Sequence, residues 1–146
     1  MTVVIERATL DDLPWIMNMH HHYLQCGHDE EYFERHLDLV KPWVWTAREQ
    51  DTPLGYIMAR NENGWVHVVS MAVERTRRRK GVATELMNLL MEEARAEEES
   101  LFGVWGHVRE SNLSAQDFYE RTGFLLSFDG YYEDDDGKIL FLQSFS

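Results

Sequence analysis

The stretch Arg78-Arg79-Lys80-Gly81-Val82-Ala83 decides the fold, because it joins an apolar run that ends near Val73 to a strongly helical segment. Positions 75–80 hold five of the 14 basic residues, although the whole chain of 146 residues has a net charge of −12. Gly81 lets the backbone pass close to a ligand. The free N–H groups and the positive dipole end of the following helix attract anions. We therefore predict a phosphate site at the junction of a strand and a helix.

Hydrophobic periodicity outlines the elements around this junction. Alternating or continuous apolar residues predict strands, and apolar residues at helical spacing, with cap residues before them, predict helices. The expected strands are 3–7, 43–48, 54–60, 65–73, 101–108, 124–128 and 138–145, and the expected helices begin after Thr9, cover 30–39, begin at Val82 and cover 114–121. Asn63-Gly64 predicts a tight hairpin turn. One domain, 1–146, is long enough to bury a core.

Composition excludes several classes of protein. Cys26 is the only cysteine, so an intrachain disulfide cannot form. No apolar run is long enough to cross a membrane, and the acidic balance argues against nucleic acid as a partner. The consecutive His20, His21 and His22 point in different directions on a helix and cannot easily chelate one metal ion. We expect a cytoplasmic protein without a metal that attracts cationic ligands.

A second block lies downstream of the basic stretch. Residues 106–124 read Gly-His-Val-Arg-Glu-Ser-Asn-Leu-Ser-Ala-Gln-Asp-Phe-Tyr-Glu-Arg-Thr-Gly-Phe. Together the two blocks resemble the GCN5-related N-acetyltransferase (GNAT) superfamily, whose signature Arg/Gln-x-x-Gly-x-Gly/Ala holds the pyrophosphate of acetyl-coenzyme A. The resemblance implies an α/β (α+β) fold with a mixed central sheet of about seven strands and about four flanking helices. It also implies that the central parallel strands, 65–73 and 101–108, splay apart to admit the pantetheine arm of the cofactor.

The resemblance assigns a donor site. The backbone of Met71, Ala72 and Val73 would pair with the pantetheine amides. Asn112 would contact pantetheine as well, although it could instead cap the next helix, as could Ser111. The pyrophosphate would be held by the residues of the signature stretch, namely Arg78, Arg79, Lys80, Gly81, Val82, Ala83 and Thr84. Acetyl-coenzyme A is therefore the expected cosubstrate.

Three side chains are candidates for the chemistry. Tyr119 matches the tyrosine that protonates the departing thiolate in the family, and His107 would remove the proton of the attacking amine. His67 matches a position that holds a catalytic tyrosine in some protein N-terminal acetyltransferases. The alternative for Tyr119 is a core residue, and for His107 a hydrogen-bonded histidine at a strand end.

Tyr131 and Tyr132 resemble the pair that lines the peptide groove of the RimI/Ard1-like protein N-acetyltransferases. The expected reaction is acetyl transfer to a primary amine, first of all the amine of a protein N-terminus or lysine. The N-terminal helices, which build the acceptor site in the family, do not match this subgroup. A polyamine or aminoglycoside-like amine therefore stays open as the acceptor, and so does a coenzyme A-binding module without catalysis. The final strand, 139–145, could pair across a homodimer.

Overall fold

The computed structural model describes residues 2–23, 29–75, 81–97, 102–127 and 137–145, which form two compact units. The first unit comprises Met1–Arg60 and Val69–Glu92, and the second comprises Asn61–Val68 and Glu93–Ser146. Strand β4 contributes its first half to the second unit and its second half to the first unit. Each unit is described by itself below, and the single domain over 1–146 stays a prediction.

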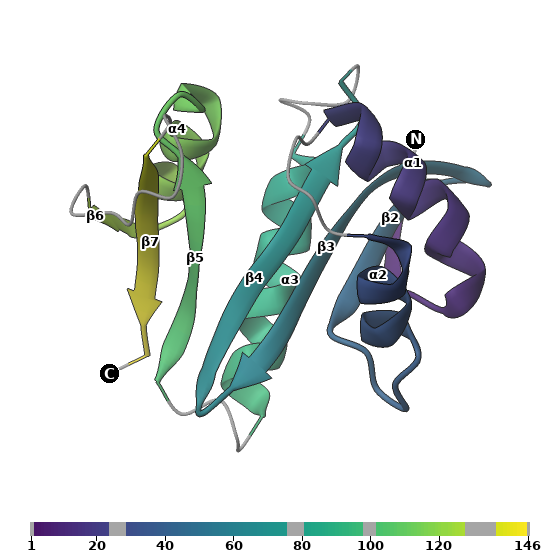
Figure 1. Ribbon diagram of the computed structural model, residues 1–146, viewed down its shortest axis with the longest axis horizontal. Helices are drawn as coiled ribbons and strands as arrows, with labels where there is room; N and C mark the ends of the chain where they lie inside the picture. Colours follow the sequence, from purple (N-terminus) through teal and green to yellow (C-terminus); the bar gives the residue numbers. More distant parts are fainter. Residues whose placement is uncertain (1, 24–28, 76–80, 98–101, 128–136, 146) are drawn as a thin grey trace. The chain divides into compact units, whose positions relative to one another are not determined.

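The described strands form one mixed sheet with the order β1-β2-β3-β4-β5-β7-β6 (Figure 1). Its elements are β1 (Val3–Arg7), η1 (Leu10–Asp12), α1 (Leu13–Tyr23), α2 (Glu30–Leu37), β2 (Val44–Glu49), β3 (Thr52–Glu62), β4 (Trp65–Val73), α3 (Val82–Ala96), β5 (Gly103–Arg109), α4 (Leu113–Arg121), β6 (Leu125–Ser127) and β7 (Lys138–Ser144). Strands β4 and β5 run parallel, and β5 pairs with β7 in antiparallel fashion. The expected sheet of seven strands with four helices is confirmed.

In the first unit the chain folds as the cap residues predict. Thr9 forms a capping box with Asp12 at the start of η1, and Asp29 accepts a hydrogen bond of 2.9 Å from the backbone N–H of Tyr32 at the start of α2. Helix α2 ends at Leu37, two residues before the expected end. No helix in the described ranges is both long and apolar enough to span a bilayer.

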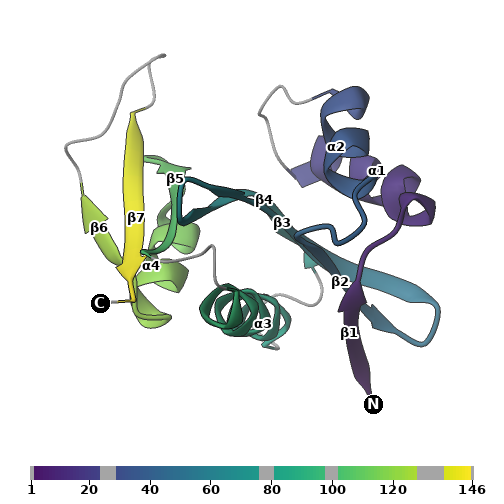
Figure 2. The same cartoon turned by 90° about the horizontal axis from the view of Figure 1, so that it is seen from below.

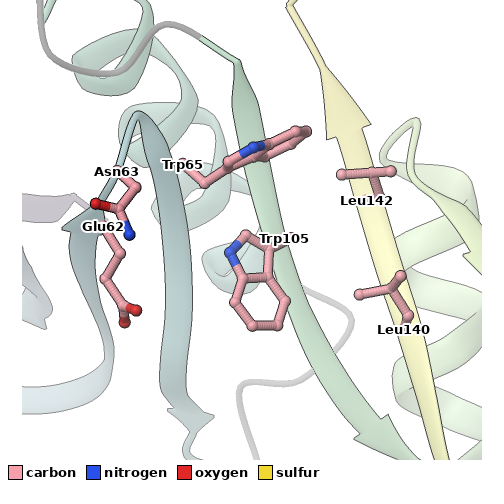
Figure 3. Close-up of a pocket in the computed structure, with 6 residues that line it drawn as sticks. All are labelled: Glu62, Asn63, Trp65, Trp105, Leu140 and Leu142. Carbon is pink, nitrogen blue, oxygen red and sulfur yellow. The ribbon is translucent and has the colours of Figure 1, made fainter.

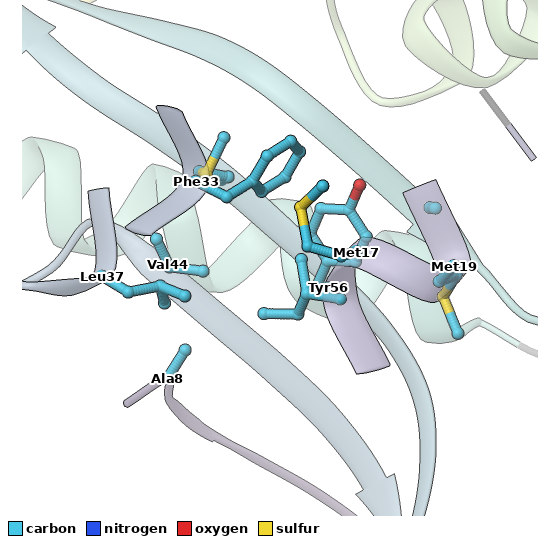
Figure 4. Packing of buried hydrophobic residues seen from close by; sticks show 10 residues of the cluster. Ala8, Met17, Met19, Phe33, Leu37, Val44 and Tyr56 are labelled. Atoms are coloured by element: carbon cyan, nitrogen blue, oxygen red, sulfur yellow. The ribbon is translucent and has the colours of Figure 1, made fainter. Parts of the chain in front are cut away.

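Helices α1 and α2 cover one face of the strands of the first unit, and α3 covers the other face (Figure 2). The core between the strands and the first two helices is built around Phe33 and Tyr56, both fully buried (Figure 4). His20 belongs to this core, with its ring centroid 4.7 Å from that of Phe33. The described residues contain no group of three or more His, Cys, Asp or Glu side chains that could hold a metal ion.

The second unit is built on the antiparallel pairs β5–β7 and β6–β7. Its hairpin turn has φ 53° at Asn63 and φ 89° at Gly64, as the Asn-Gly pair predicts. Leu140, Phe141 and Leu142 of β7 are paired on both sides, with β5 and with β6. The expectation that the final strand offers an exposed edge for a homodimer is therefore wrong for these residues, because their backbone groups already have partners on two neighbouring strands.

We expect the buried hydrogen bond between Tyr56 and Ser70 to stabilise the first unit as a pair. The two hydroxyl oxygens lie 2.7 Å apart. Tyr56→Phe and Ser70→Ala should each lower the free energy of unfolding by about 1–3 kcal/mol, because each leaves a buried hydroxyl without its partner. The double variant should cost less than the sum of the single ones, as measured by urea unfolding. Additive losses would show that the two hydroxyls do not depend on each other.

Candidate active site

The two parallel strands of the second unit carry the same short pattern, Trp-x-His. Strand β4 begins Trp65-Val66-His67, and β5 contains Trp105-Gly106-His107. In the parallel register Trp65 faces Gly103 and His67 faces Trp105. Because side chains alternate between the two faces of a strand, both tryptophans and both histidines project from one face. The register thus places the histidine of one strand beside the tryptophan of the other.

The Trp105 indole contacts both histidines. The His67 ring stacks on it with centroids 4.1 Å apart and an interplanar angle of 7°. The His107 ring meets the same indole at 5.4 Å and 89°. On the other side of His67, its Nδ1 lies 3.6 Å from Oε1 of Glu62, the last residue of β3. His107 is exposed and His67 is half-buried, so the site combines one histidine open to solvent with one that is held by its neighbours.

A pocket of about 400 Å³ opens beside these rings (Figure 3). The indoles of Trp65 and Trp105 lie at its centre, between the end of β3 and the strand β7. Its lining residues are Glu62, Asn63, Trp65, Trp105, Leu140 and Leu142. In the register of β5 with β7, Trp105 faces Leu142 and His107 faces Leu140. The pocket therefore shares a face of the sheet with both histidines.

Tyr119 lies on the opposite face of the β5–β7 ladder. Its ring stacks on Phe141 with centroids 3.7 Å apart and an interplanar angle of 12°. Phe141 faces Gly106 in the register, one position from the pair of His107 with Leu140. A Cβ at Gly106 would lie 2.5 Å from the Phe141 ring, so only glycine lets this aromatic stack approach the strand. Helix α4 thus brings a phenol to the strand that carries His107, but from the other side.

Burial raises the pKa of Tyr119 above its ordinary value of 10.0. The phenol therefore keeps its proton throughout the physiological pH range and can act as a hydrogen-bond donor. Transfer of that proton to a thiolate is uphill, because ordinary thiols have pKa values near 8.5. The environment of Tyr119 suits a hydrogen bond to a developing thiolate better than complete proton transfer.

Most of the described residues expected to bind the donor lie in the first unit, at the end of β4 and the start of α3, whereas Asn112 and Tyr119 lie in the second unit. Met71 is half-buried, and Ala72 and Val73 are buried, so only their backbone is suited to pair with a ligand. Gly81 is exposed with φ 83°, and no described atom lies within 4 Å of a Cβ placed on it. Immediately after it, Val82, Ala83 and Thr84 form the first turn of α3, whose N–H groups lack partners within the helix.

These features fit an anionic group such as the pyrophosphate of acetyl-coenzyme A. No described atom crowds Gly81 at the start of the helix, and the first turn offers N–H donors at the positive end of the helix dipole. Arg78, Arg79 and Lys80 lie outside the described residues, as do Tyr131 and Tyr132. Their roles therefore stay predictions, and so does the donor site as a whole.

Asn112 is the N-cap of α4, which was the alternative expected for it. Its side-chain oxygen accepts a hydrogen bond of 3.1 Å from the backbone N–H of Ala115. Asn112 is exposed, and the cap does not exclude a ligand contact, so contact with pantetheine stays a prediction.

Several residues of the site were not singled out from the sequence, above all Trp65, Trp105 and Glu62. A signal for the tryptophans was present, because each stands two residues before a candidate histidine and strand alternation places it on the same face. Glu62 had a weaker signal, since it precedes a hairpin turn that folds it back toward His67. Phe141 had no such signal, because its contact with Tyr119 depends on the pairing of distant strands.

We predict that Tyr119→Phe lowers kcat at least about tenfold and leaves the thermal midpoint of unfolding nearly unchanged. The substitution removes the donor hydroxyl and keeps the ring that stacks on Phe141. Tyr119→Leu is the matched control for packing, and it should lower both the rate and the thermal midpoint. A Tyr119→Phe variant with a normal rate would limit Tyr119 to a structural role.

Comparisons with known proteins identify the family and the fold. A model of the acetyltransferase (GNAT) family matches residues 9–124. An N-alpha-acetyltransferase of Saccharolobus solfataricus is 30% identical over 93% of this chain and 89% of its own length. The N-terminal acetyltransferase A complex catalytic subunit NAA10 of Arabidopsis thaliana is 33% identical over 82% of this chain and 65% of its own length. The crystal structure of Ard1 from Thermoplasma volcanium has the same fold, with a TM-score of 0.86 at 18% identity over 99% of this chain and 98% of that one.

Proposed function

The chain belongs to the acetyltransferase (GNAT) family, and we propose that it transfers the acetyl group of acetyl-coenzyme A to the α-amine of a protein N-terminus. That it is an acetyl-coenzyme A-dependent N-acetyltransferase follows from the family and from its relatives. The choice of the α-amine is supported by the names of the two relatives, an N-alpha-acetyltransferase and an N-terminal acetyltransferase subunit. We also propose that the enzyme works in the cytoplasm.

The observation that carries this proposal is the pair of histidines on one face of β4 and β5, each in contact with Trp105. An amine must lose its proton before it can attack a carbonyl carbon. The pKa of a protein α-amine is about 7.7–8.0, whereas that of a lysine side chain is about 10.4. Imidazole, with an ordinary pKa of about 6.5, is matched far better to the α-amine than to lysine.

We assign the base to His107, because it is exposed on the face that an acceptor can reach. It takes a proton from the α-ammonium group, directly or through one water molecule, and the neutral nitrogen then bonds to the acetyl carbon. His67 is held between Trp105 and Glu62, so we assign it a positioning role toward the acceptor.

Tyr119 acts at the other end of the reaction, from the opposite face of β5. The thioester supplies an activated acetyl group with a thiolate as its leaving group. As the carbon–sulfur bond breaks, the Tyr119 hydroxyl donates a hydrogen bond to the sulfur. The thiolate takes up, through water, the second proton that the acetylated nitrogen releases, and coenzyme A leaves as the free thiol. Because Tyr119 and His107 lie on opposite faces of β5, the Tyr119 hydroxyl does not donate to the amine that must stay neutral.

We expect peptides with a free N-terminus to be acetylated at the α-amine and peptides with a blocked N-terminus and an internal lysine to react at least tenfold more slowly. The measurement is release of free thiol from acetyl-coenzyme A, with the modified nitrogen located by mass spectrometry. A polyamine and an aminoglycoside serve as matched small acceptors. Acetylation confined to these two small amines, or to the lysine side chain, would refute the α-amine as the acceptor.

The roles of the two histidines should separate by substitution. His107→Ala should lower kcat about a hundredfold or more, because the base is gone. His67→Ala should raise KM for the peptide more than it lowers kcat. The KM for acetyl-coenzyme A serves as the internal control in both variants. A larger loss of kcat in His67→Ala than in His107→Ala would exchange the two assignments.

A further inference from the structure

We propose that the pocket beside Trp105 is a subsite for a lysine or arginine side chain of the acceptor polypeptide, carried by its second or third residue. This inference rests on the proposed function, because it takes the acceptor to be a peptide whose α-amine lies at His107. The pocket lies wholly within the second unit, as do both histidines.

The aromatic lining favours a cation. The indoles of Trp65 and Trp105 both line the pocket, and indole is the aromatic ring that attracts cations most strongly. His67 covers the side of Trp105 that faces β4, whereas Leu142 lies across the register on β7, beside the pocket. Figure 3 shows the two rings presented between the strands rather than packed beneath a helix.

The charge of the lining favours a cation as well. Among the described residues that line the pocket, Glu62 is the only charged side chain. Its Oε1 lies 3.6 Å from Nδ1 of His67. The net charge of −12 for the whole chain adds a long-range attraction for basic peptides.

The apolar wall suits the stem of a long basic side chain. Leu140 and Leu142 form this wall on β7, opposite Glu62 and Asn63 at the end of β3 (Figure 3). Lysine and arginine carry three or four methylene groups that pack on apolar surface while the charged head reaches a polar partner. A pocket with leucines on one side and a carboxylate on the other accommodates both parts of such a side chain.

The distance to the base fixes the position in the acceptor. Trp105 precedes His107 by two residues on the same face of β5, which corresponds to about 7 Å along a strand. An extended acceptor peptide has the same rise per residue, so its second or third side chain comes level with Trp105 when its α-amine is at His107. The subsite therefore recognises the side chain of the second or third residue of the acceptor peptide.

The experiment compares matched peptides that differ at one position. Each peptide carries lysine, norleucine or glutamate at position 2 or at position 3 and is otherwise identical. Norleucine keeps the apolar stem without the charge. At one of the two positions we expect kcat/KM to be about three- to thirtyfold higher for lysine than for norleucine, the range typical of a cation on an indole face. We expect glutamate to be the poorest of the three.

Variants of the lining test the cause of this preference. Glu62→Gln and Trp65→Leu should each lower the ratio of kcat/KM between the lysine and norleucine peptides toward one. Glu62 also contacts His67, so Glu62→Gln can change the rate for every peptide. The readout is therefore the ratio of kcat/KM between the lysine and norleucine peptides, measured on the same variant. Glu49→Gln is the matched control, since Glu49 is outside the pocket lining, at the end of β2, and should keep the ratio of the parent enzyme.

The outcomes separate the two proposals. Equal rates for lysine and norleucine, or a lysine preference that Glu62→Gln leaves intact, would overturn the subsite while α-amine acetylation stands. Acetylation of none of the peptides, with acetylation of a polyamine, would refute the proposed function and the subsite with it. A preference for lysine that falls in both lining variants and persists in Glu49→Gln would establish the subsite.

Discussion

The short parallel ladder between β4 and β5 fixes which side chains meet in the second unit. It pairs His67 with Trp105 and Trp65 with Gly103. The two Trp-x-His segments therefore lie side by side, displaced by two residues along the strands. A shift of one residue would turn His67 to the opposite face and separate it from Trp105. The stack of imidazole on indole and the pocket beside Trp105 depend on this register, whereas the contact of His67 with Glu62 is formed across the Asn63-Gly64 hairpin.

Strand β5 also separates the exposed His107 from the buried Tyr119, which lie on its two faces. His107 faces the aqueous side, where a polar base can exchange protons with solvent, whereas Tyr119 is buried against Phe141 on the other side. Burial keeps the phenol protonated, which a donor of hydrogen bonds needs, and exposure suits a base that must return its proton to water. Gly106 makes this possible, because any side chain between Trp105 and His107 would displace the Phe141 ring. A single glycine thus connects the packing of the core to the position of Tyr119.

Much of this could be predicted from the sequence. The long apolar pattern of 65–73, the helical spacing from Val82 and the Asn63-Gly64 turn are local signals, and each element formed nearly where it was expected. Tyr119 and His107 were singled out because they stand at fixed distances within one motif, and their roles stay predictions. Trp105 was not singled out, because its contact with His67 comes from the register between β4 and β5, and Glu62 meets His67 only across the hairpin turn. The position of β7 between β5 and β6 was missed for the same reason, since chain order does not reveal which strand becomes the edge.

The turn at Asn63-Gly64 has a consequence for how this enzyme could diversify. Glu62, Trp65 and His67 all come from six consecutive residues, whereas the residues expected to hold acetyl-coenzyme A come from the end of β4 and the start of α3. Glu62 and Trp65, which line the proposed acceptor subsite, therefore lie in one short hairpin that folds from local signals and holds none of the residues expected to bind acetyl-coenzyme A. Such a hairpin can be exchanged as a unit. New acceptor preferences could therefore arise from changes in residues 62–67 while the residues expected to bind acetyl-coenzyme A stay unchanged.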